Sequence, residues 1–287
     1  MLGMGVHFVI GDPIGHSLSP IIYNTLYQYY KMQVTCLTAR VAEKELASFM
    51  KLHRNFDVTA YNVTVPHKAA VIPFLDEVEE HARASSSVNC VVVDEQRRLH
   101  GYSTDGLGFC LSLAEYKVQM RGQNVVIIGA GGAASAIAET ALREEAASLV
   151  ILARRREQAR ELAQAISLES DHPCWGDSWE HIANYMPNTD VLIQCTSLGM
   201  QGYGHDFEDL SFLELLPRSA AVCDIVYQPA KTHFLQAAAE HGNLIVGGIG
   251  MLIWQAFACF ELCYGSLPGA TEMERVKTAL RQEGYQV

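Results

Sequence analysis

Two ionisable residues in the first third of the chain could exchange a proton with a substrate. Lys68 lies just past a strand-like segment at residues 58–65, and Asp105 lies where another strand-like segment gives way to a helical one. If those strand ends face each other, each charge tunes the pKa of the other, and the ammonium can donate to a carbonyl oxygen while a hydride arrives from a cofactor. Taken alone, such a lysine is more often a solvated surface charge, and the aspartate could equally cap a helix.

A second polar cluster lies at residues 11–20, which lead into a helical segment and contain Ser17 and Ser19. A carboxylate at a helix start is stabilised by the helix dipole and by free backbone N–H groups. The alternative, favoured by composition alone, makes Ser19 the N-cap, with Pro20 at the first helical position and Ser17 in a turn. Thr64, on one face of the strand before Lys68, is a further polar candidate.

A glycine-rich turn near the middle of the chain predicts a dinucleotide site. Four β-branched residues, 125–128, run directly into Gly129, and an alanine-rich helical pattern follows as far as Leu142. Gly129 permits a tight turn, Gly131 lets the backbone approach a pyrophosphate, and Ala134 lets the helix pack closely on its strand. The free N–H groups that open the helix would meet the phosphate charge.

The residues after the next strand bear on the choice of cofactor. An NAD-specific fold usually ends this strand with an acidic residue that binds the ribose 2′-hydroxyl. Here residues 149–153 run into Arg154, Arg155 and Arg156, with no acid before Glu157. Guanidinium groups can hold a 2′-phosphate through charge-assisted bonds, and three cations at a positive helix start are unfavourable without an anion. The pattern predicts NADP rather than NAD, the alternative being a solvated basic helix start.

The elements that must position these residues alternate between strand and helix. Such alternation is typical of an α/β fold with a parallel sheet covered by helices on both faces. The strands are expected at residues 7–10, 34–39, 58–65, 88–94, 98–102, 125–128, 149–153, 191–195, 221–226 and 244–246. The helices are expected at residues 19–31, 43–52, 67–73, 76–84, 106–116, 132–142, 157–166, 234–241, 251–264 and 272–282.

Composition narrows the class of protein. The chain has 287 residues, of which 49% are hydrophobic and 18% charged, which suits a globular protein of two domains. Its net charge of −11 argues against a nucleic-acid partner, because no basic surplus is left to neutralise phosphates. No apolar run reaches membrane-spanning length, and the N-terminus lacks a basic region and a cleavage site. These features predict a cytoplasmic protein.

None of the eight cysteines forms a Cys-x-x-Cys pair, so zinc spacing is absent. A disulfide framework is not expected at this size, and several cysteines lie inside apolar runs. We therefore expect buried free thiols in a reducing compartment, and no metal.

Taken together in order, these segments resemble the shikimate dehydrogenase family over nearly the whole chain. The matching blocks lie at residues 11–24, 62–68, 88–89, 101–106, 129–134, 195–200, 224–229 and 248–255. The resemblance implies two α/β domains around a cleft, the second a Rossmann-type domain. They would comprise residues 1–105 plus 251–287 for substrate binding and catalysis, and residues 106–250 for NADP.

The resemblance also implies an activity, the reversible NADP-dependent reduction of 3-dehydroshikimate to shikimate in chorismate and aromatic amino-acid biosynthesis. Lys68 and Asp105 would be the catalytic pair. Ser17 and Ser19 would bind the substrate carboxylate, and the ring hydroxyls would be held by Thr64, Asn89, Asp105 and Gln255. Tyr227 would lie near the substrate. The cofactor would contact Gly129, Ala130, Gly131, Gly132, Ala133, Ala134, Arg154, Arg155, Thr196, Ser197, Gly248 and Met251.

The chain departs from the family pattern in places. Ser103 stands where the family usually has Asn, Cys90 where Thr often follows Asn89, and Cys195 where Asn is common. The first two lie beside substrate ligands and leave open a quinate or dual quinate/shikimate dehydrogenase. A non-catalytic ligand sensor of the same fold and a homodimer also stay open. Of the family's Asn-Arg-Thr NADP motif, only Arg154 is retained.

Overall fold

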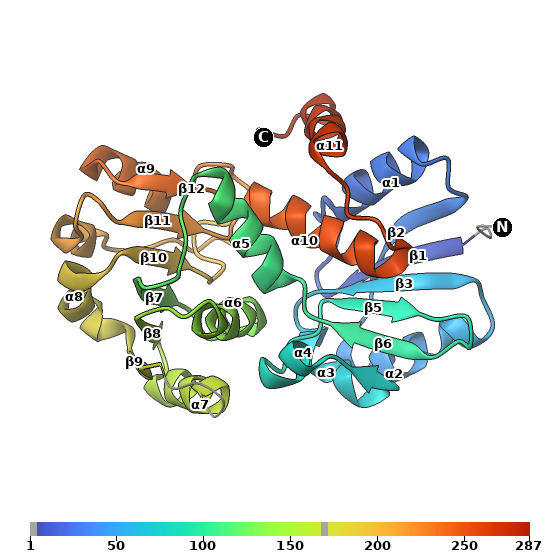
Figure 1. Ribbon diagram of the computed structural model, residues 1–287, viewed down its shortest axis with the longest axis horizontal. Helices are drawn as coiled ribbons and strands as arrows, with labels where there is room; N and C mark the ends of the chain where they lie inside the picture. The colour runs from blue at the N-terminus through green and yellow to red at the C-terminus, as the bar shows by residue number, and fades with distance from the viewer. Residues whose placement is uncertain (1–4, 168–171) are drawn as a thin grey trace. The chain divides into compact units, whose positions relative to one another are not determined.

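The chain folds as two compact units (Figure 1). In the computed structural model, which describes residues 5–167 and 172–287, the first unit comprises Met1–Gly108 and Ile253–Val287, and the second comprises Phe109–Leu252. The boundaries expected from the sequence, after residues 105 and 250, lie within a few residues of these.

The first unit is built on a six-stranded mixed sheet in the order β2-β1-β3-β5-β6-β4. Strand β1 pairs in parallel with β2 and β3, whereas β5 is antiparallel to both β3 and β6. Its strands are β1 (Gly5–Gly11), β2 (Val34–Arg40), β3 (Val58–Val63), β4 (Glu77–Val78), β5 (Cys90–Val93) and β6 (Leu99–Tyr102). Its helices include α1 (Ser19–Tyr29), α2 (Leu46–Phe49), α3 (His67–Ala70), α4 (Glu80–Ala84) and α11 (Ala270–Gln282).

The second unit contains a fully parallel sheet in the order β12-β11-β10-β7-β8-β9. Its strands are β7 (Asn124–Ile128), β8 (Ser148–Ala153), β9 (Cys174–Ser178), β10 (Val191–Gln194), β11 (Ala221–Asp224) and β12 (Leu244–Val246). Its helices are α6 (Gly132–Arg143), α7 (Arg156–Ile166), α8 (Ile182–Tyr185) and α9 (His233–His241). The unit boundaries fall inside α5 (Asp105–Glu115) and α10 (Gly248–Tyr264).

The β-branched run of β7 explains why helices cover both faces of this sheet. Val125 and Ile127 pack into one core with α6 and α7, whereas Val126 and Ile128 pack into another with α8 and α9. Because side chains alternate along a strand, an apolar residue at every position requires apolar cover on each face. The predicted parallel α/β sheet is confirmed.

Several local expectations were wrong. Ser19 is the first residue of α1 rather than its N-cap: Leu18 holds that position, and no side chain caps the helix. The helix expected at residues 43–52 is divided into short helical turns, among them α2, and the hydrogen bond from the Ala42 N–H to Glu45 at 3.1 Å caps the first of them. The segment 76–84 contains strand β4 before a shorter helix, and β9 was missed because its mixed polar sequence shows no strand periodicity.

All eight cysteines are free, five of them buried and three partly exposed. Within the two described ranges, no helix combines the length and apolar character needed to cross a membrane.

Candidate active site

Most of the predicted substrate residues gather at one edge of the first sheet. Parallel strands β1 and β3 both end there, and the connection continues past β3, where Thr64 N–H donates to Ile10 O at 2.9 Å. Antiparallel β5 begins at the same edge and β6 ends there, since Cys90 pairs with both Asn62 and Tyr102. The segments that carry Ser17, Ser19, Thr64, Lys68, Asn89 and Asp105 therefore leave the sheet on one side.

Lys68 and Asp105 meet directly. The Lys68 Nζ donates to Asp105 Oδ2, and the two side chains are only 12% and 7% exposed. Breaking a buried pair by removing one partner leaves an uncompensated charge, which is strongly destabilising. Two groups that are far apart in the sequence are thus held as a preformed donor and acceptor.

Asn89 holds the other oxygen of that carboxylate. Its Nδ2 donates to Asp105 Oδ1 at 2.8 Å and to Gln255 Oε1 at 3.2 Å, while its own Oδ1 accepts from the Thr104 N–H at 2.7 Å. All four residues are buried. This network joins four of the predicted residues, Lys68, Asp105, Asn89 and Gln255; Thr104, which also belongs to it, was not predicted.

Gln255 reaches the network because α5 and α10 approach unusually closely. A Cβ on Gly108 would lie 2.6 Å from Gln255 N and 2.8 Å from its Cα. A side chain there would collide with backbone, so only glycine permits this crossing. Sequence reasoning missed this residue, and the one available signal was a second glycine inside the helical pattern after Asp105.

Ser17, Ser19 and Thr64 follow strands that end at the same edge of the sheet, and among the described residues none of the three has a hydrogen bond to this network. Ser17 Oγ accepts from the Ser19 N–H at 3.3 Å, and Ser19 is 6% exposed. Because Ser19 does not cap α1, the competing explanation for its hydroxyl is not supported.

In the second unit, the turn between β7 and α6 has the shape expected of a phosphate cradle. Gly129 adopts φ +113°, a conformation that favours glycine, and Gly131 is the N-cap of α6 with no side chain bound to the first N–H groups. A Cβ on Gly131 would meet nothing within 4 Å, so the approach to these donors is open. Gly132, Ala133 and Ala134 supply the first turn of the helix. The residues present fit a dinucleotide pyrophosphate.

The three arginines after β8 are not equivalent. Arg156 pairs with Asp177 at 2.8 Å, and Arg155 donates to Gln158, which in turn donates to Ala130 O at 3.0 Å in the glycine turn. Arg154 is exposed, with no ion pair within the described ranges. The sequence predicted that all three guanidinium groups could bind a 2′-phosphate. Because Arg156 is already paired with Asp177, only Arg154 and Arg155 remain available for that role.

A buried polar network, missed from the sequence, supports the loop that contains Thr196 and Ser197. Gln194 accepts from the Thr196 N–H and donates to Leu198 O at 3.2 Å and to Asp224 Oδ1 at 3.3 Å. Burial raises the pKa of Asp224 to about 7, against the lowering effect of hydrogen bonds from Thr232 and Val226. The network fixes the loop that follows β10.

The remaining predicted residues of the second unit lie after β11 and β12. Tyr227 follows β11 and is half-buried, Gly248 begins α10, and Met251 packs into the core with α6 and α7. Their predicted contacts with substrate or cofactor stay predictions.

Two family models match the chain. The shikimate dehydrogenase substrate binding domain matches residues 9–91, and the shikimate/quinate 5-dehydrogenase model matches residues 112–200. The NADP(+) shikimate dehydrogenase of Pyrococcus abyssi is 37% identical over 273 residues, which cover 95% of this chain and 97% of the relative.

Solved structures agree with these matches. The shikimate 5-dehydrogenase of Thermus thermophilus in complex with NADP(H) and shikimate is 28% identical, with a TM-score of 0.83 and coverage of 96% of this chain and 100% of that one. A 5-ketofructose reductase of Gluconobacter is 27% identical at the same TM-score, covering 97% and 99%. By its family models and its relatives, the chain belongs to the shikimate dehydrogenase family.

Proposed function

We propose that this chain catalyses the reversible, NADP-dependent reduction of 3-dehydroshikimate to shikimate. The observation that carries the proposal is the buried Lys68–Asp105 pair, held by Asn89 and Gln255 at one edge of the first sheet. Relatives named NADP(+) shikimate dehydrogenase, matched over almost their full length, support it.

In this proposal Lys68 moves the proton. Its ammonium donates to the ketone oxygen during reduction and recovers the proton from the hydroxyl during oxidation. Bound NADPH supplies the hydride that the ring carbon receives. Asp105 orients the ammonium and accepts a hydrogen bond from a ring hydroxyl.

The substrate is held by hydrogen bonds from the same edge of the sheet. Ser17 and Ser19 donate to its carboxylate, while Thr64, Asn89 and Gln255 bind ring hydroxyls. Because Asn89 and Gln255 are already fixed by each other, little side-chain entropy is lost on binding. The first unit thus acts as the substrate-binding catalytic domain.

The second unit acts as the NADP-binding domain. The glycine turn from Gly129 to Ala134 binds the pyrophosphate, and Arg154 and Arg155 bind the 2′-phosphate of the adenosine ribose. Thr196, Ser197, Gly248 and Met251 are the further cofactor contacts. In the same proposal Tyr227 lies near the substrate. We also propose that the protein forms a homodimer, which sedimentation of the purified protein tests.

The test is an assay of the purified protein with shikimate or quinate, and with NADP or NAD. Turnover of shikimate with NADP is expected to exceed every other combination. Higher kcat/KM with quinate would identify the alternative dehydrogenase, for which Ser103 and Cys90 are the sequence departures. Because one structural neighbour is a 5-ketofructose reductase, 5-ketofructose belongs in the substrate panel. Binding without turnover of any of the three would favour a ligand sensor and overturn the proposal.

A further inference from the structure

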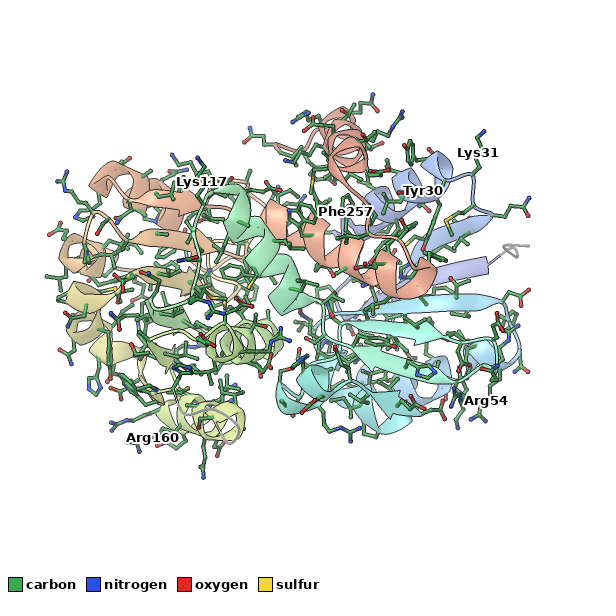
Figure 2. The ribbon with its side chains drawn as sticks, in the orientation of Figure 1. Tyr30, Lys31, Arg54, Lys117, Arg160 and Phe257 are labelled. Atoms are coloured by element: carbon green, nitrogen blue, oxygen red, sulfur yellow. The ribbon has the colours of Figure 1, made fainter. Side chains whose placement is uncertain are left out.

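Three thiols come together inside the first unit. Cys90 begins β5, while Cys259 and Cys263 lie one turn apart on α10, the helix on which Phe257 is labelled in Figure 2. Their sulfur atoms all lie within 4.8 Å of one another. Cys90 and Cys259 are fully buried, and Cys263 is partly exposed.

This spacing is close to that of a metal-thiolate site. With zinc–sulfur bonds of about 2.3 Å, sulfur atoms around one ion lie about 3.8–4.0 Å apart. Residues four apart on a helix project from the same face, so Cys259 and Cys263 can act together with the strand thiol. Small side-chain rotations would be enough to bring the three sulfurs into a common coordination shell.

Two buried polar side chains border the cluster. His7 is fully buried; its Nδ1 is hydrogen-bonded to the Tyr27 hydroxyl at 2.7 Å, and its ring also interacts with the Asn62 side chain. The buried Tyr23 hydroxyl interacts with Cys259. Hydrogen-bonding neighbours of this kind orient the side chains that ligate a metal.

The donor set selects the kind of ion. Thiolate sulfur suits soft or borderline cations such as Zn²⁺ or Cd²⁺, and not Mg²⁺ or Ca²⁺. A divalent ion would offset most of the charge of the three thiolates, which a buried site could not otherwise hold.

We propose that Cys90, Cys259 and Cys263 form a binding site for a thiophilic divalent cation of the zinc class. The spacing of these cysteines in the sequence differs from Cys-x-x-Cys and gives no zinc motif, which is why the sequence alone predicted no metal.

The cysteines neighbour residues of the substrate network along the chain, although the proposed metal site is independent of the proposed function. Cys90 follows Asn89, and Gln255, Cys259 and Cys263 recur every four residues along α10. An ion held by β5 and α10 would therefore fix α10, which carries Gln255, to the strand that Asn89 immediately precedes, and so support the Asn89–Gln255 hydrogen bond. Occupancy is expected to raise thermal stability, because a ligand that binds only the folded state shifts unfolding by mass action.

The experiment titrates reduced, metal-free, full-length protein with Cd²⁺ and follows the ultraviolet sulfur-to-cadmium charge-transfer absorption. The expected result is saturation at one equivalent, suppression by prior addition of Zn²⁺, and a higher Tm. Cys263→Ser should weaken Cd²⁺ binding by more than about tenfold, since loss of even an outer-shell partner costs about that much. Cys90→Ser should act in the same way.

Cys223→Ser, which alters a buried thiol in β11 of the other unit, is the matched control and should leave the titration unchanged. Because Cys263 is partly exposed whereas Cys90 is fully buried, Cys263→Ser is expected to disturb folding less than Cys90→Ser. Absence of the absorption band, or an equal band in Cys263→Ser, would overturn the proposal. So would a disulfide between two of the three cysteines that persists after treatment with a thiol reductant.

Discussion

The substrate-side and cofactor-side residues differ in how many of their hydrogen-bond and ion-pair partners the fold itself supplies. In the first unit, Lys68, Asp105, Asn89 and Gln255 bind one another and are largely buried. In the second, Arg154 and the glycine turn present exposed or uncapped donors. A prearranged network lowers the entropy lost on binding, whereas open cationic groups gain their partner only when an anion arrives. Changes in the first group should therefore affect the chemical step and folding, and changes in the second should affect affinity alone.

The strongest test of this contrast is Lys68→Ala. A positioned acid–base group contributes about 100- to 10,000-fold in rate, so kcat should fall within that range while the Kd for NADP stays near the wild-type value. Lys44→Ala, an exposed lysine of the same unit, should match wild type in both measurements. A Lys68→Ala variant that keeps more than about a tenth of the wild-type kcat removes Lys68 from the proton-transfer role.

On the cofactor side, Arg154→Ala should lower kcat/KM for NADP by about 10- to 100-fold, the loss expected of a hydrogen bond to a charged group. It should leave kcat/KM for NAD unchanged and should not alter Tm. Arg160→Ala, on the exposed side of α7, is the control. Equal efficiency of the wild type with NAD and NADP would contradict the assignment.

The cofactor-side turn was predictable because its signal is local. The run into Gly129, the glycine spacing and the following helix are adjacent in the sequence, and the structure contains this strand, turn and helix. The meeting of Lys68 with Asp105 depends on the register of β3, β5 and β6, which no local pattern specifies; only the family resemblance supplied it.

Gly108, Gln194 and the three-cysteine cluster were missed for the same reason. Each matters through a residue distant in the chain: Gln255 for Gly108, Asp224 for Gln194, and Cys90 for the two cysteines of α10. Long-range packing, rather than propensity, places them.

Gly108→Ala tests whether the substrate network depends on close helix packing. The new methyl group would lie 2.6 Å from Gln255 N, so α5 and α10 must separate. Overpacking of this kind costs about 1–3 kcal/mol of unfolding free energy, and the displaced Gln255 should raise KM for shikimate. At Gly269 an added Cβ would meet only a flexible carboxylate oxygen at 3.7 Å, so Gly269→Ala is the matched control. Unchanged stability and KM in Gly108→Ala would show that the crossing is not needed.

Ser19→Ala tests whether a serine outside the prearranged hydrogen-bond network also binds the substrate. If the hydroxyl binds the substrate carboxylate, its loss should raise KM for shikimate by about tenfold, with little change in kcat or Tm. The structure supports this direction, since the Ser19 side chain does not cap α1. A lower Tm with an unchanged KM would instead assign Ser19 to the stability of the helix start.

The smallest effect concerns two buried carboxyl groups of the second sheet. Burial raises the pKa of Asp224 to about 7, whereas hydrogen bonds from Tyr185, Ser178 and His181, with Arg156 nearby, outweigh burial and lower that of Asp177 to about 2. Between about pH 4 and pH 7 the folded state retains a proton on Asp224 that the unfolded state has released, so this group's contribution to stability falls as pH rises through that window. For Asp177 the sign is reversed, and its contribution is lost as pH falls from about 4 to about 2. Thermal unfolding of Asp224→Asn and Asp177→Asn across pH 3–8 checks both signs. The Tm difference between wild type and Asp224→Asn should shift in favour of the variant as pH rises from 4 to 7, whereas the Asp177→Asn difference should stay constant in that range. A Tm difference between wild type and Asp224→Asn that does not change with pH would mean that Asp224 is ionised in the folded protein. The loop after β10 would then be held through a buried negative charge.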